Sequence, residues 1–485
     1  MATDAVAGAE GPSPVGWPAT IGSCVLCLVA VWTVFDDRPL AHACSAAAFV
    51  GFIALANARF GLRERMLLTL ALVATAGAVW TFRAGALQPV IDDLSRAAYL
   101  SAFIMLVTSL RQGAFGSESV LTIGRYLTGQ PPGRRYLALH IGGHFMGVLL
   151  NFGAVSLLGP LIKRGVDARR KEGPPELSAI RLRRQICGLS RGFAWFNLWA
   201  PTAVAQAVVL NLVPGSRAGI IAVSGMLIAV LLLFAGWGED RVTGYRARLR
   251  LVRAGFALQR AAPPPFPWTS LMRFLAVGGA LLGLAWLISV FSGIVLVSAI
   301  MVAAVPVTIA WMSEQSLLHG AGAALAGRVR TLFRTIIPAS SPEAATLGLA
   351  GYIGILTATL VDHGWLATRL AQIDIRPDVV YLAVSAFVPL ASCIGLPPMM
   401  TVTFLGGVLV SLPELALNPS VLGLSLLVGW ALNLTGSPFG ATSLMLTRVV
   451  GIPGTTHAWR WNGGFTLISW CVAALVMMAM AAWLG

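Results

Sequence analysis

Two segments within the apolar parts of the sequence carry the same small group of polar residues followed by a proline. The first is FNLWAPTAV (196–204), which contains Asn197, and the second is LNLTGSPFGAT (432–442), which contains Asn433. Proline lacks an amide hydrogen and clashes with the preceding helical turn, so we expect a helix to break at each place. A break exposes helix N-termini, whose unpaired amides suit an anion, and helix C-terminal carbonyls, which suit sodium.

A third apolar stretch, residues 136–163, cannot be a simple membrane crossing. It lies between two basic segments, 111–135 and 163–191, which the positive-inside rule places on the same cytoplasmic side. A re-entrant helical hairpin, with its turn at LLNFGA around Asn151 and Gly153, would return the chain to that side. Such a turn at mid-depth requires burial in protein or a cavity beside it.

A similar stretch, residues 379–412, is interrupted by SCIGLPP (392–398) and has flanks poor in Lys and Arg. We therefore expect a second hairpin that enters from the external side. Each hairpin is followed by one of the interrupted segments, and paired Gly/Pro-interrupted segments in two halves are typical of inverted-repeat transporters.

The polar and flexible residues at these four interruptions form one candidate site. Asn, Ser and Thr side chains supply hydrogen bonds without net charge, although they could instead satisfy broken helix ends or allow close packing. The candidate substrate-binding residues are Asn151, Gly153, Asn197, Thr202, Asn433, Thr435, Ser437 and Thr442. The candidate coupling-ion residues are Asn151, Gly395, Pro397 and Gly436.

Three ionisable residues lie near this site. His140 and His144, one turn apart on the entering arm of the first hairpin, could bind the coupled proton or simply hydrogen-bond between Gly-rich helices. Arg191 could pair with a substrate carboxylate or anchor its helix at the cytoplasmic surface. We find no Asp or Glu deep in a predicted crossing, which argues against cation exchange and favours an anionic or neutral substrate.

The composition indicates which elements position these residues. The 485-residue chain is 57% hydrophobic and 11% charged, with a mean hydropathy of +0.80, whereas a soluble domain carries roughly 25% charged residues. We expect an all-α polytopic membrane protein with about eleven transmembrane helices and two re-entrant hairpins. The expected crossings are 17–34, 40–57, 66–86, 94–110, 187–213, 217–237, 268–290, 294–312, 343–361, 419–447 and 465–484.

Charge patterning sets the expected organisation. The net charge of +15 comes from Lys and Arg in loops, which positive-inside topology explains without a nucleic-acid partner. We expect a cytoplasmic N-terminal tail (1–15), a first repeat (16–237), a basic cytoplasmic linker (238–267) and a second repeat (268–485). The six cysteines lie in apolar runs and predict no metal site.

The order of crossings, hairpins and broken helices resembles the ion-transporter superfamily, whose best-known branch is the divalent-anion/sodium symporters. Arsenite permeases and some sodium/proton antiporters share that fold. The first tip keeps Asn151 of the family's Ser-Asn-Thr signature, the second tip has Gly395 and Pro397 but no Asn, and TGSPFGATSLM is similar to the family's Thr-Pro-Pro-Asn stretch. The resemblance implies a moving transport domain and a homodimer.

From the residues and the resemblance together we expect a secondary active transporter, not an enzyme, in the inner membrane. It would move a small anion, an organic carboxylate or an inorganic oxyanion, by alternating access coupled to sodium or protons. We expect no cofactor beyond sodium as a coupling ion. Two alternatives remain open: a membrane-embedded acyl or glycosyl transferase with His144 as general base and Asn151 nearby, or an exporter of a neutral oxyacid such as arsenite.

Overall fold

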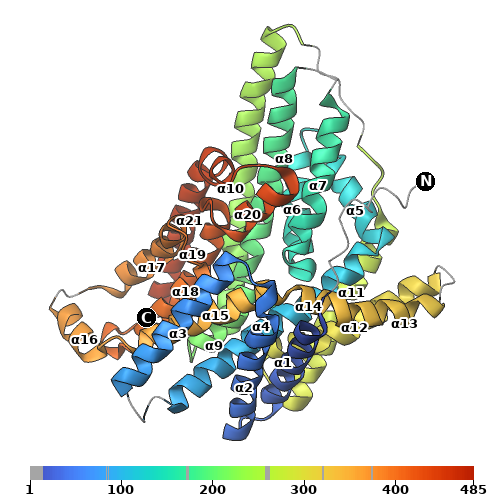
Figure 1. Cartoon of the computed structure of the whole chain (residues 1–485). Coiled ribbons are helices and arrows are strands. Elements are labelled where there is room, and N and C mark those ends of the chain that lie inside the picture. Colours follow the sequence, from blue (N-terminus) through green and yellow to red (C-terminus); the bar gives the residue numbers. More distant parts are fainter. Residues whose placement is uncertain are drawn as a thin grey trace. The chain divides into compact units, whose positions relative to one another are not determined.

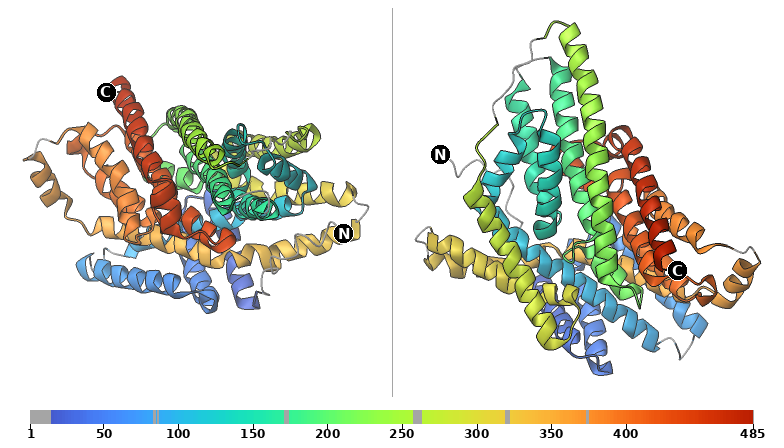
Figure 2. Two further views of the ribbon diagram at one scale, coloured as in Figure 1. Left: turned by 90° about the horizontal axis from the view of Figure 1, so that it is seen from above. Right: turned by 180° about the vertical axis from the view of Figure 1, so that it is seen from behind.

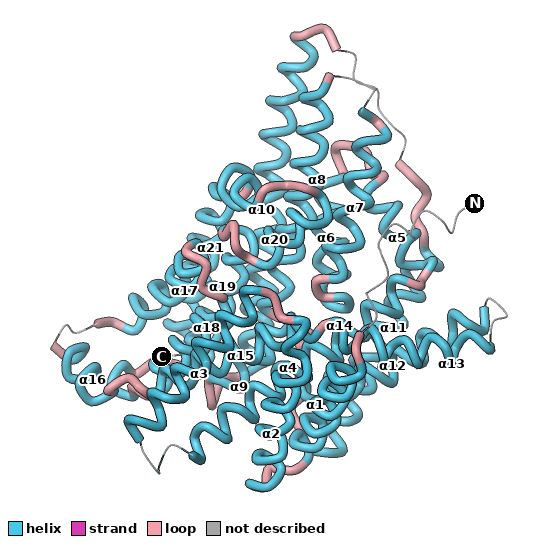
Figure 3. Tube along the Cα trace, in the orientation of Figure 1, coloured by secondary structure: helices cyan, strands magenta, loops and turns pink. Residues whose placement is uncertain are grey.

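The computed structural model describes residues 15–82, 85, 87–170, 174–256, 263–318, 322–372 and 375–484. Within these ranges the chain is made of helices joined by loops, with no strand (Figure 3). Almost all of the expected N-terminal tail, residues 1–14, lies outside the described residues.

Eight of the described helices are long and apolar enough to cross a membrane, or nine if α15 is counted with the short helix after it. Several expose large apolar side chains: Trp80 is 87% exposed and Phe291 is 85% exposed. The most apolar part of α11 (Trp268–Ser292) is only 17% buried. Such surfaces are stable only against lipid or another apolar partner. The chain is therefore an all-α, multi-pass membrane protein.

Every expected crossing coincides with a helix or with two consecutive helices. The two crossings that do not qualify by length and apolarity are α4, which carries the buried Asp93, and the pair α8–α9, which carries the buried Arg191. Both are amphipathic or interrupted because they pack inside the protein and not against lipid.

The helices fall into two compact units, and each predicted repeat contributes to both. Unit 1 contains the described residues of Met1–Ser117 and Val277–Leu360, and unit 2 those of Glu118–Ala276 and Val361–Gly485. Helix α11 begins in unit 2 and ends in unit 1. The other helices of unit 1 are α1 (Trp17–Phe35), α2 (Pro39–Ala56), η1 (Asn57–Arg59), α3 (Leu62–Phe82), α4 (Leu87–Phe115), α12 (Leu296–Leu318), α13 (Gly322–Thr331), η5 (Leu332–Ile336), α14 (Ile337–Ala339) and α15 (Ser341–Thr359).

Unit 1 is organised around α4, which contacts α1, α2, α12 and α15. Two features let these helices approach closely. Ser109 of α4 and Thr308 of α12 share a hydrogen bond of 3.1 Å. Gly348 of α15 lies against Ser101 and the carbonyl of Ala97, where a Cβ atom would overlap the Ser101 hydroxyl. Small residues at helix contacts are typical of packing within membranes.

Unit 2 contains both predicted hairpins and both predicted broken helices. Its helices are α5 (Glu118–Thr128), α6 (Arg135–Leu150), α7 (Gly153–Ala168), α8 (Pro175–Trp195), η4 (Phe196–Leu198), α9 (Val204–Leu212), α10 (Ala218–Arg253), α16 (His363–Ala371), α17 (Pro377–Cys393), α18 (Pro398–Val410), η6 (Pro413–Leu415), α19 (Pro419–Gly436), α20 (Ala441–Val450), η7 (Thr456–Trp461) and α21 (Gly463–Leu484).

The chain doubles back at each expected tip. A two-residue turn joins α6 to α7 and a four-residue turn joins α17 to α18, and the two arms of each hairpin contact one another. The helix breaks also occur where proline predicts them, between α8 and α9 and between α19 and α20. Helices α6, α7, α8 and α10 run side by side (Figure 1, Figure 2).

Helix contacts within unit 2 follow one rule in both repeats. The entering arm of each hairpin packs along the first half of the broken helix that follows it, α6 on α8 and α17 on α19. The leaving arm packs on the second half of the other repeat's broken helix, α7 on α20 and α18 on α9. Such an exchange of arms is what two equivalent, intertwined repeats produce.

The segments expected to join the repeats are more helical than composition suggests. Helix α10 continues through the first part of the expected linker 238–267 and ends at Arg253, while residues 257–262 lie outside the described residues. Acidic residues Glu239 and Asp240 are therefore inside a helix, where they pair with arginines of α8.

Candidate functional site

The tip of the first hairpin is built on a strained residue. Asn151 ends α6 with φ = 49°, a left-handed value that costs energy for a residue with a Cβ atom. Its backbone N–H donates to the carbonyl of Gly147 at 2.8 Å. Its side-chain Nδ2 is buried and has no hydrogen-bond partner among the described residues. Gly153, the first residue of α7, is buried directly after the turn.

The first helix break holds one satisfied and one unsatisfied candidate. Asn197, in η4, donates from Nδ2 to the carbonyls of Phe193 (3.4 Å) and Ala194 (3.1 Å), and so closes the end of α8. Thr202 is buried just before α9, and its hydroxyl has no partner within the described part of the chain. Gln206, which the sequence did not single out, donates to the freed carbonyl of Leu198 at 2.6 Å.

The two predicted proton-binding histidines hold hairpin 1 against the first break. Nδ1 of His144 lies 3.0 Å from the carbonyl of Gly192, and Nε2 accepts a hydrogen bond from the Trp199 indole at 2.8 Å. Both ring nitrogens are therefore used by the neutral imidazole. His140 lies 3.3 Å from the Tyr136 hydroxyl, and its backbone carbonyl packs directly on Gly192. This arrangement favours the packing role for both histidines.

The second helix break holds the least satisfied side chain of the set. Asn433, in the last turn of α19, is fully buried, and neither its Nδ2 nor its Oδ1 has a partner among the described residues. Gly440 lies so close that a Cβ atom there would approach the Asn433 carbonyl to 2.6 Å. Thr442, on the first turn of α20, is also fully buried with a hydroxyl that lacks a partner in the described ranges. The most apolar part of the segment Pro419–Val450 is 94% buried, and Asn433 and Thr442 are themselves fully buried, so these atoms face protein and not lipid.

The remaining candidates of the second break are hydrogen-bonded. Thr435 donates to the Leu432 carbonyl at 3.3 Å and shares a 3.0 Å hydrogen bond with Thr466 of α21. Ser437 donates from Oγ to the carbonyl of Ser392, on hairpin 2, at 3.0 Å. This bond ties the tip of hairpin 2 to the break.

The expected coupling-ion residues of the second repeat lie at and beside that tip. Gly395 has φ = 94°, which requires glycine, and is exposed; Pro397 caps α18. The carbonyl of Gly436, at the end of α19, lies 3.9 Å from the Cys393 sulfur.

The structure thus separates the eight predicted substrate residues into two groups. Four of them, Asn151, Thr202, Asn433 and Thr442, carry buried polar atoms without a partner in the described part of the chain. Asn197, Thr435 and Ser437 are satisfied by protein groups, and Gly153 has no side chain to offer. The two breaks are neighbours, because η4 and α9 both contact α19.

No protein-family model and no curated protein matches the sequence. The structure is similar to the crystal structure of the Alcanivorax borkumensis YdaH transporter, which was described as having an unusual topology, with a TM-score of 0.51 and 14% identity. The match covers 87% of this chain and 99% of that one. The chain has the fold of a membrane transporter. At this identity the likeness concerns the fold alone.

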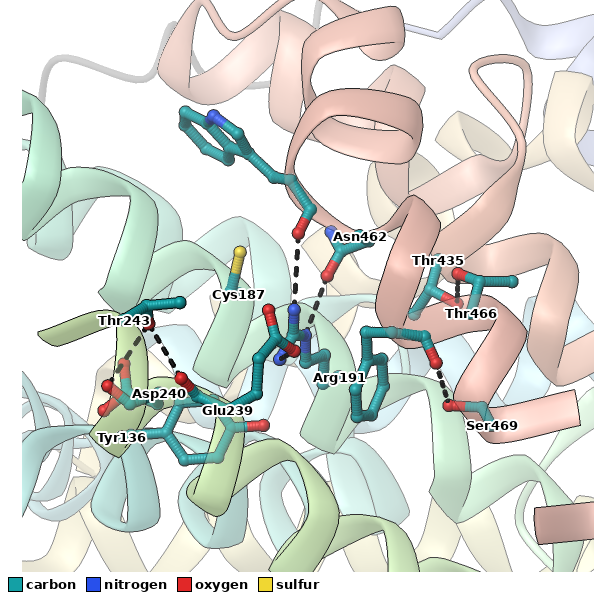
Figure 4. A network of polar contacts seen from close by, with 12 residues as sticks. Tyr136, Cys187, Arg191, Glu239, Asp240, Thr243, Thr435, Asn462, Thr466 and Ser469 are labelled. Atoms are coloured by element: carbon teal, nitrogen blue, oxygen red, sulfur yellow. Dashed lines mark hydrogen bonds and ion pairs between the residues drawn. The ribbon is translucent and has the colours of Figure 1, made fainter. Parts of the chain in front are cut away.

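Within this transporter fold, sequence reasoning missed a buried charge network at the first broken helix (Figure 4). Arg191 donates from Nη1 to Glu239 of α10 at 2.7 Å and from Nε to Asn462 at 2.8 Å, and Nη2 lies 3.3 Å from the carbonyl of Trp461. Its guanidinium lies 4.0 Å above the Phe465 ring. The expected surface anchor is wrong: Arg191 is 2% exposed and joins α8 to α10 and to the segment before α21.

A second missed group is His457, in the π-helix η7. Its side chain is fully buried, Nδ1 lies 2.9 Å from the Ser443 hydroxyl, and Nε2 has no partner among the described residues. π-Helical turns often occur at functional sites. A lone histidine between apolar segments gives no sequence signal of this kind, because its partners come from α20.

One hollow in the described part of the structure lies elsewhere. It measures about 640 Å³, is open, and is lined in unit 1 by Leu72, Thr75, Ala76, Val79 and Trp80 of α3. None of the candidate site residues lines it, so the case for a binding site comes from the unsatisfied polar atoms.

Proposed function

We propose that this protein is a secondary active transporter of a small anion, an organic carboxylate or an inorganic oxyanion. It moves that anion across the inner membrane by alternating access, coupled to sodium or protons. We also propose that it belongs with the ion-transporter superfamily, close to the divalent-anion/sodium symporters, with a cytoplasmic N-terminus and a homodimeric assembly.

One observation carries this proposal: four uncharged side chains, each at a hairpin tip or a helix break of unit 2, have buried polar atoms without partners in the described chain. Leaving a buried donor or acceptor unsatisfied costs about 1–3 kcal/mol. By contrast, Asn197, which closes a helix end, and Ser437, which ties hairpin 2 to the break, are satisfied. A solute that hydrogen-bonds to Asn433 and Thr442 accounts for the difference.

The charge around these atoms supports an anion. The buried Arg191 is already paired with Glu239, so it does not offer a free cation that would hold an anion too tightly for release. Helices α9 and α20 both begin directly after a break, beside Thr202 and Thr442. The partial positive charge at those N-termini favours a bound anion without a full ionic bond.

The enzymatic alternative receives no support from the geometry. It needs His144 as a general base, but both nitrogens of that ring are bonded, to Gly192 and to Trp199. A general base requires a nitrogen that can reach the substrate proton.

The test is uptake by the purified protein in liposomes, with radiolabelled acetate, succinate, citrate, sulfate and phosphate offered under sodium and proton gradients. We expect the wild type to accumulate at least one of these anions. Asn433→Ala should lower that uptake by about tenfold or more, because one lost ligand hydrogen bond of roughly 1.4 kcal/mol is a factor of ten in affinity.

Ser425→Ala is the matched control. Ser425 is equally buried on the same helix, but it donates only to the Leu422 carbonyl at 2.8 Å, about three turns before the break. This variant should transport like the wild type. Absence of uptake for every anion, or equal uptake by Asn433→Ala and Ser425→Ala, would rule out the proposed site.

A further inference from the structure

His457 presents a buried proton-accepting atom that no protein group among the described residues satisfies. The Ser443 hydroxyl lies 2.8 Å from the carbonyl of Ser437, which can only accept, so the Ser443 hydrogen points there. Ser443 must then accept from Nδ1–H of His457, at 2.9 Å. The neutral ring therefore carries its proton on Nδ1, and the lone pair of Nε2 is the buried atom without a partner in the described ranges.

These bonds connect the imidazole to the second helix break and to hairpin 2. His457 is bonded to Ser443 of α20, Ser443 to the carbonyl of Ser437 at the break, and the Ser437 hydroxyl to the carbonyl of Ser392 on hairpin 2. Thr442, with its unsatisfied hydroxyl, is the neighbour of Ser443, and η7 contacts α19, which carries Asn433.

The charged groups around His457 disfavour protonation of its imidazole unless a negative charge is added nearby. Arg191, on α8, reaches it through Asn462, which accepts from Arg191 and donates to the His457 carbonyl at 2.9 Å; Glu239 balances the Arg191 charge. The other packed elements add no acidic group. Helix α19 has no ionisable residue, α20 has the exposed Arg448, α21 has the exposed Cys471, and η7 itself has the exposed Arg460.

The geometry points to His457 as the residue that takes up a proton together with the transported anion. The step adds one proton to the Nε2 lone pair and breaks no bond, since Nδ1–H continues to donate to Ser443. Without an anion, a buried imidazolium would stand beside Arg191 with no counter-charge, which is unfavourable. A carboxylate or oxyanion at the break supplies that counter-charge and accepts from Nε2–H, so each ligand increases the affinity for the other.

This inference rests on the proposed anion transport and names the proton as its coupling ion. It is tested with His457→Asn, whose amide can still donate to Ser443 but has no nitrogen that binds a proton. His42→Gln is the control, because His42 lies in unit 1, where it bonds Ser95 and Asp37. Liposomes are assayed with the five anions named above, first with an inward proton gradient and then for anion exchange at equal pH on both sides.

We expect the proton gradient to increase anion accumulation by the wild type and by His42→Gln by about tenfold. His457→Asn should lose that increase, and the anion exchange that remains should not depend on pH, because the variant has no nitrogen that binds a proton. An undiminished response of His457→Asn to the proton gradient, or wild-type uptake driven by sodium and indifferent to pH, would overturn the inference while the transport proposal stands. Failure of the wild type to move any of the five anions would instead overturn the transport proposal, and this inference with it.

A spectroscopic readout covers the case in which His457→Asn does not fold. The chain has six histidines, so ¹⁵N-histidine NMR of the wild type in detergent can follow each ring. We expect one buried imidazole to become protonated between about pH 8 and 5 only when a transported anion is present. If every buried histidine ring stays neutral while that anion is bound, His457 does not take up the coupled proton.

Discussion

Asn197 and Asn433 have the same residue type, the same Asn-Leu context and corresponding places in the two repeats, yet their side chains are in different states. Asn197 donates to two carbonyls of its own helix, whereas both amide atoms of Asn433 lack partners in the described chain. The motif therefore combines a structural cap in one repeat with a ligand-directed group in the other.

This difference predicts opposite effects on stability. Asn433→Ala removes two unsatisfied buried atoms, so the thermal midpoint of the ligand-free protein should stay equal or rise. Asn197→Ala removes satisfied hydrogen bonds and should lower stability by about 1 kcal/mol. Thermal unfolding followed by size-exclusion chromatography in detergent compares the two variants, and a larger loss for Asn433→Ala than for Asn197→Ala would contradict a ligand-binding role for Asn433.

The sequence could identify the positions of candidate residues but not which of them are free. Proline and Asn-Leu mark the breaks because backbone chemistry is local, and Asn433, Thr442 and Thr202 were found in this way. Asn151 was found at the turn of a hairpin that the flanking basic segments predict. Whether a hydroxyl or amide has a partner depends on a neighbour far along the chain, such as Thr466 for Thr435. His144 illustrates the same limit, since its partners Gly192 and Trp199 lie on α8 and in the break that follows it.

At the scale of elements, the positions of basic segments and of prolines in the sequence were sufficient to predict two hairpins and two broken helices. Two features were not predictable in this way. The π-helix η7 has no periodic signature, because one inserted residue changes the register without changing composition. Helix α10 extends to Arg253, and Glu239 and Asp240 within it pair with Arg191 and Arg184, which lie on α8 and are distant in sequence.

The Arg191–Glu239 pair joins α8 to α10 and can be tested by a double-mutant cycle. Arg191→Met leaves Glu239 without its partner and removes the bond to Asn462, so stability should fall by roughly 3 kcal/mol. Adding Glu239→Gln should restore part of that loss, because the uncompensated charge is gone. Thermal unfolding of both single variants and the double variant gives the interaction free energy between the two side chains. Strictly additive losses of stability would mean that the two side chains do not stabilise one another.

At the scale of the whole molecule, the two units each draw helices from both halves of the sequence. Order along the chain could not predict this division, because hydropathy reports whether a helix is apolar and not which helix it packs on. The exchange of hairpin arms, α7 onto α20 and α18 onto α9, places the parts of both repeats that carry the candidate site inside unit 2. The site is therefore built within one compact unit.

The proposed inverted relation of the two repeats predicts that the two hairpins open to opposite sides of the membrane. In a variant whose six cysteines are replaced by serine, Gly133→Cys and Arg170→Cys flank hairpin 1, and Arg376→Cys and Glu414→Cys flank hairpin 2; all four positions are exposed. The excess of Lys and Arg around hairpin 1 predicts that a membrane-impermeant maleimide applied to intact cells labels the second pair and not the first. Inside-out vesicles should give the reverse pattern. If Gly133→Cys and Arg170→Cys were labelled from different sides, α6 and α7 would cross the membrane, and the equivalence of the two hairpins would be lost.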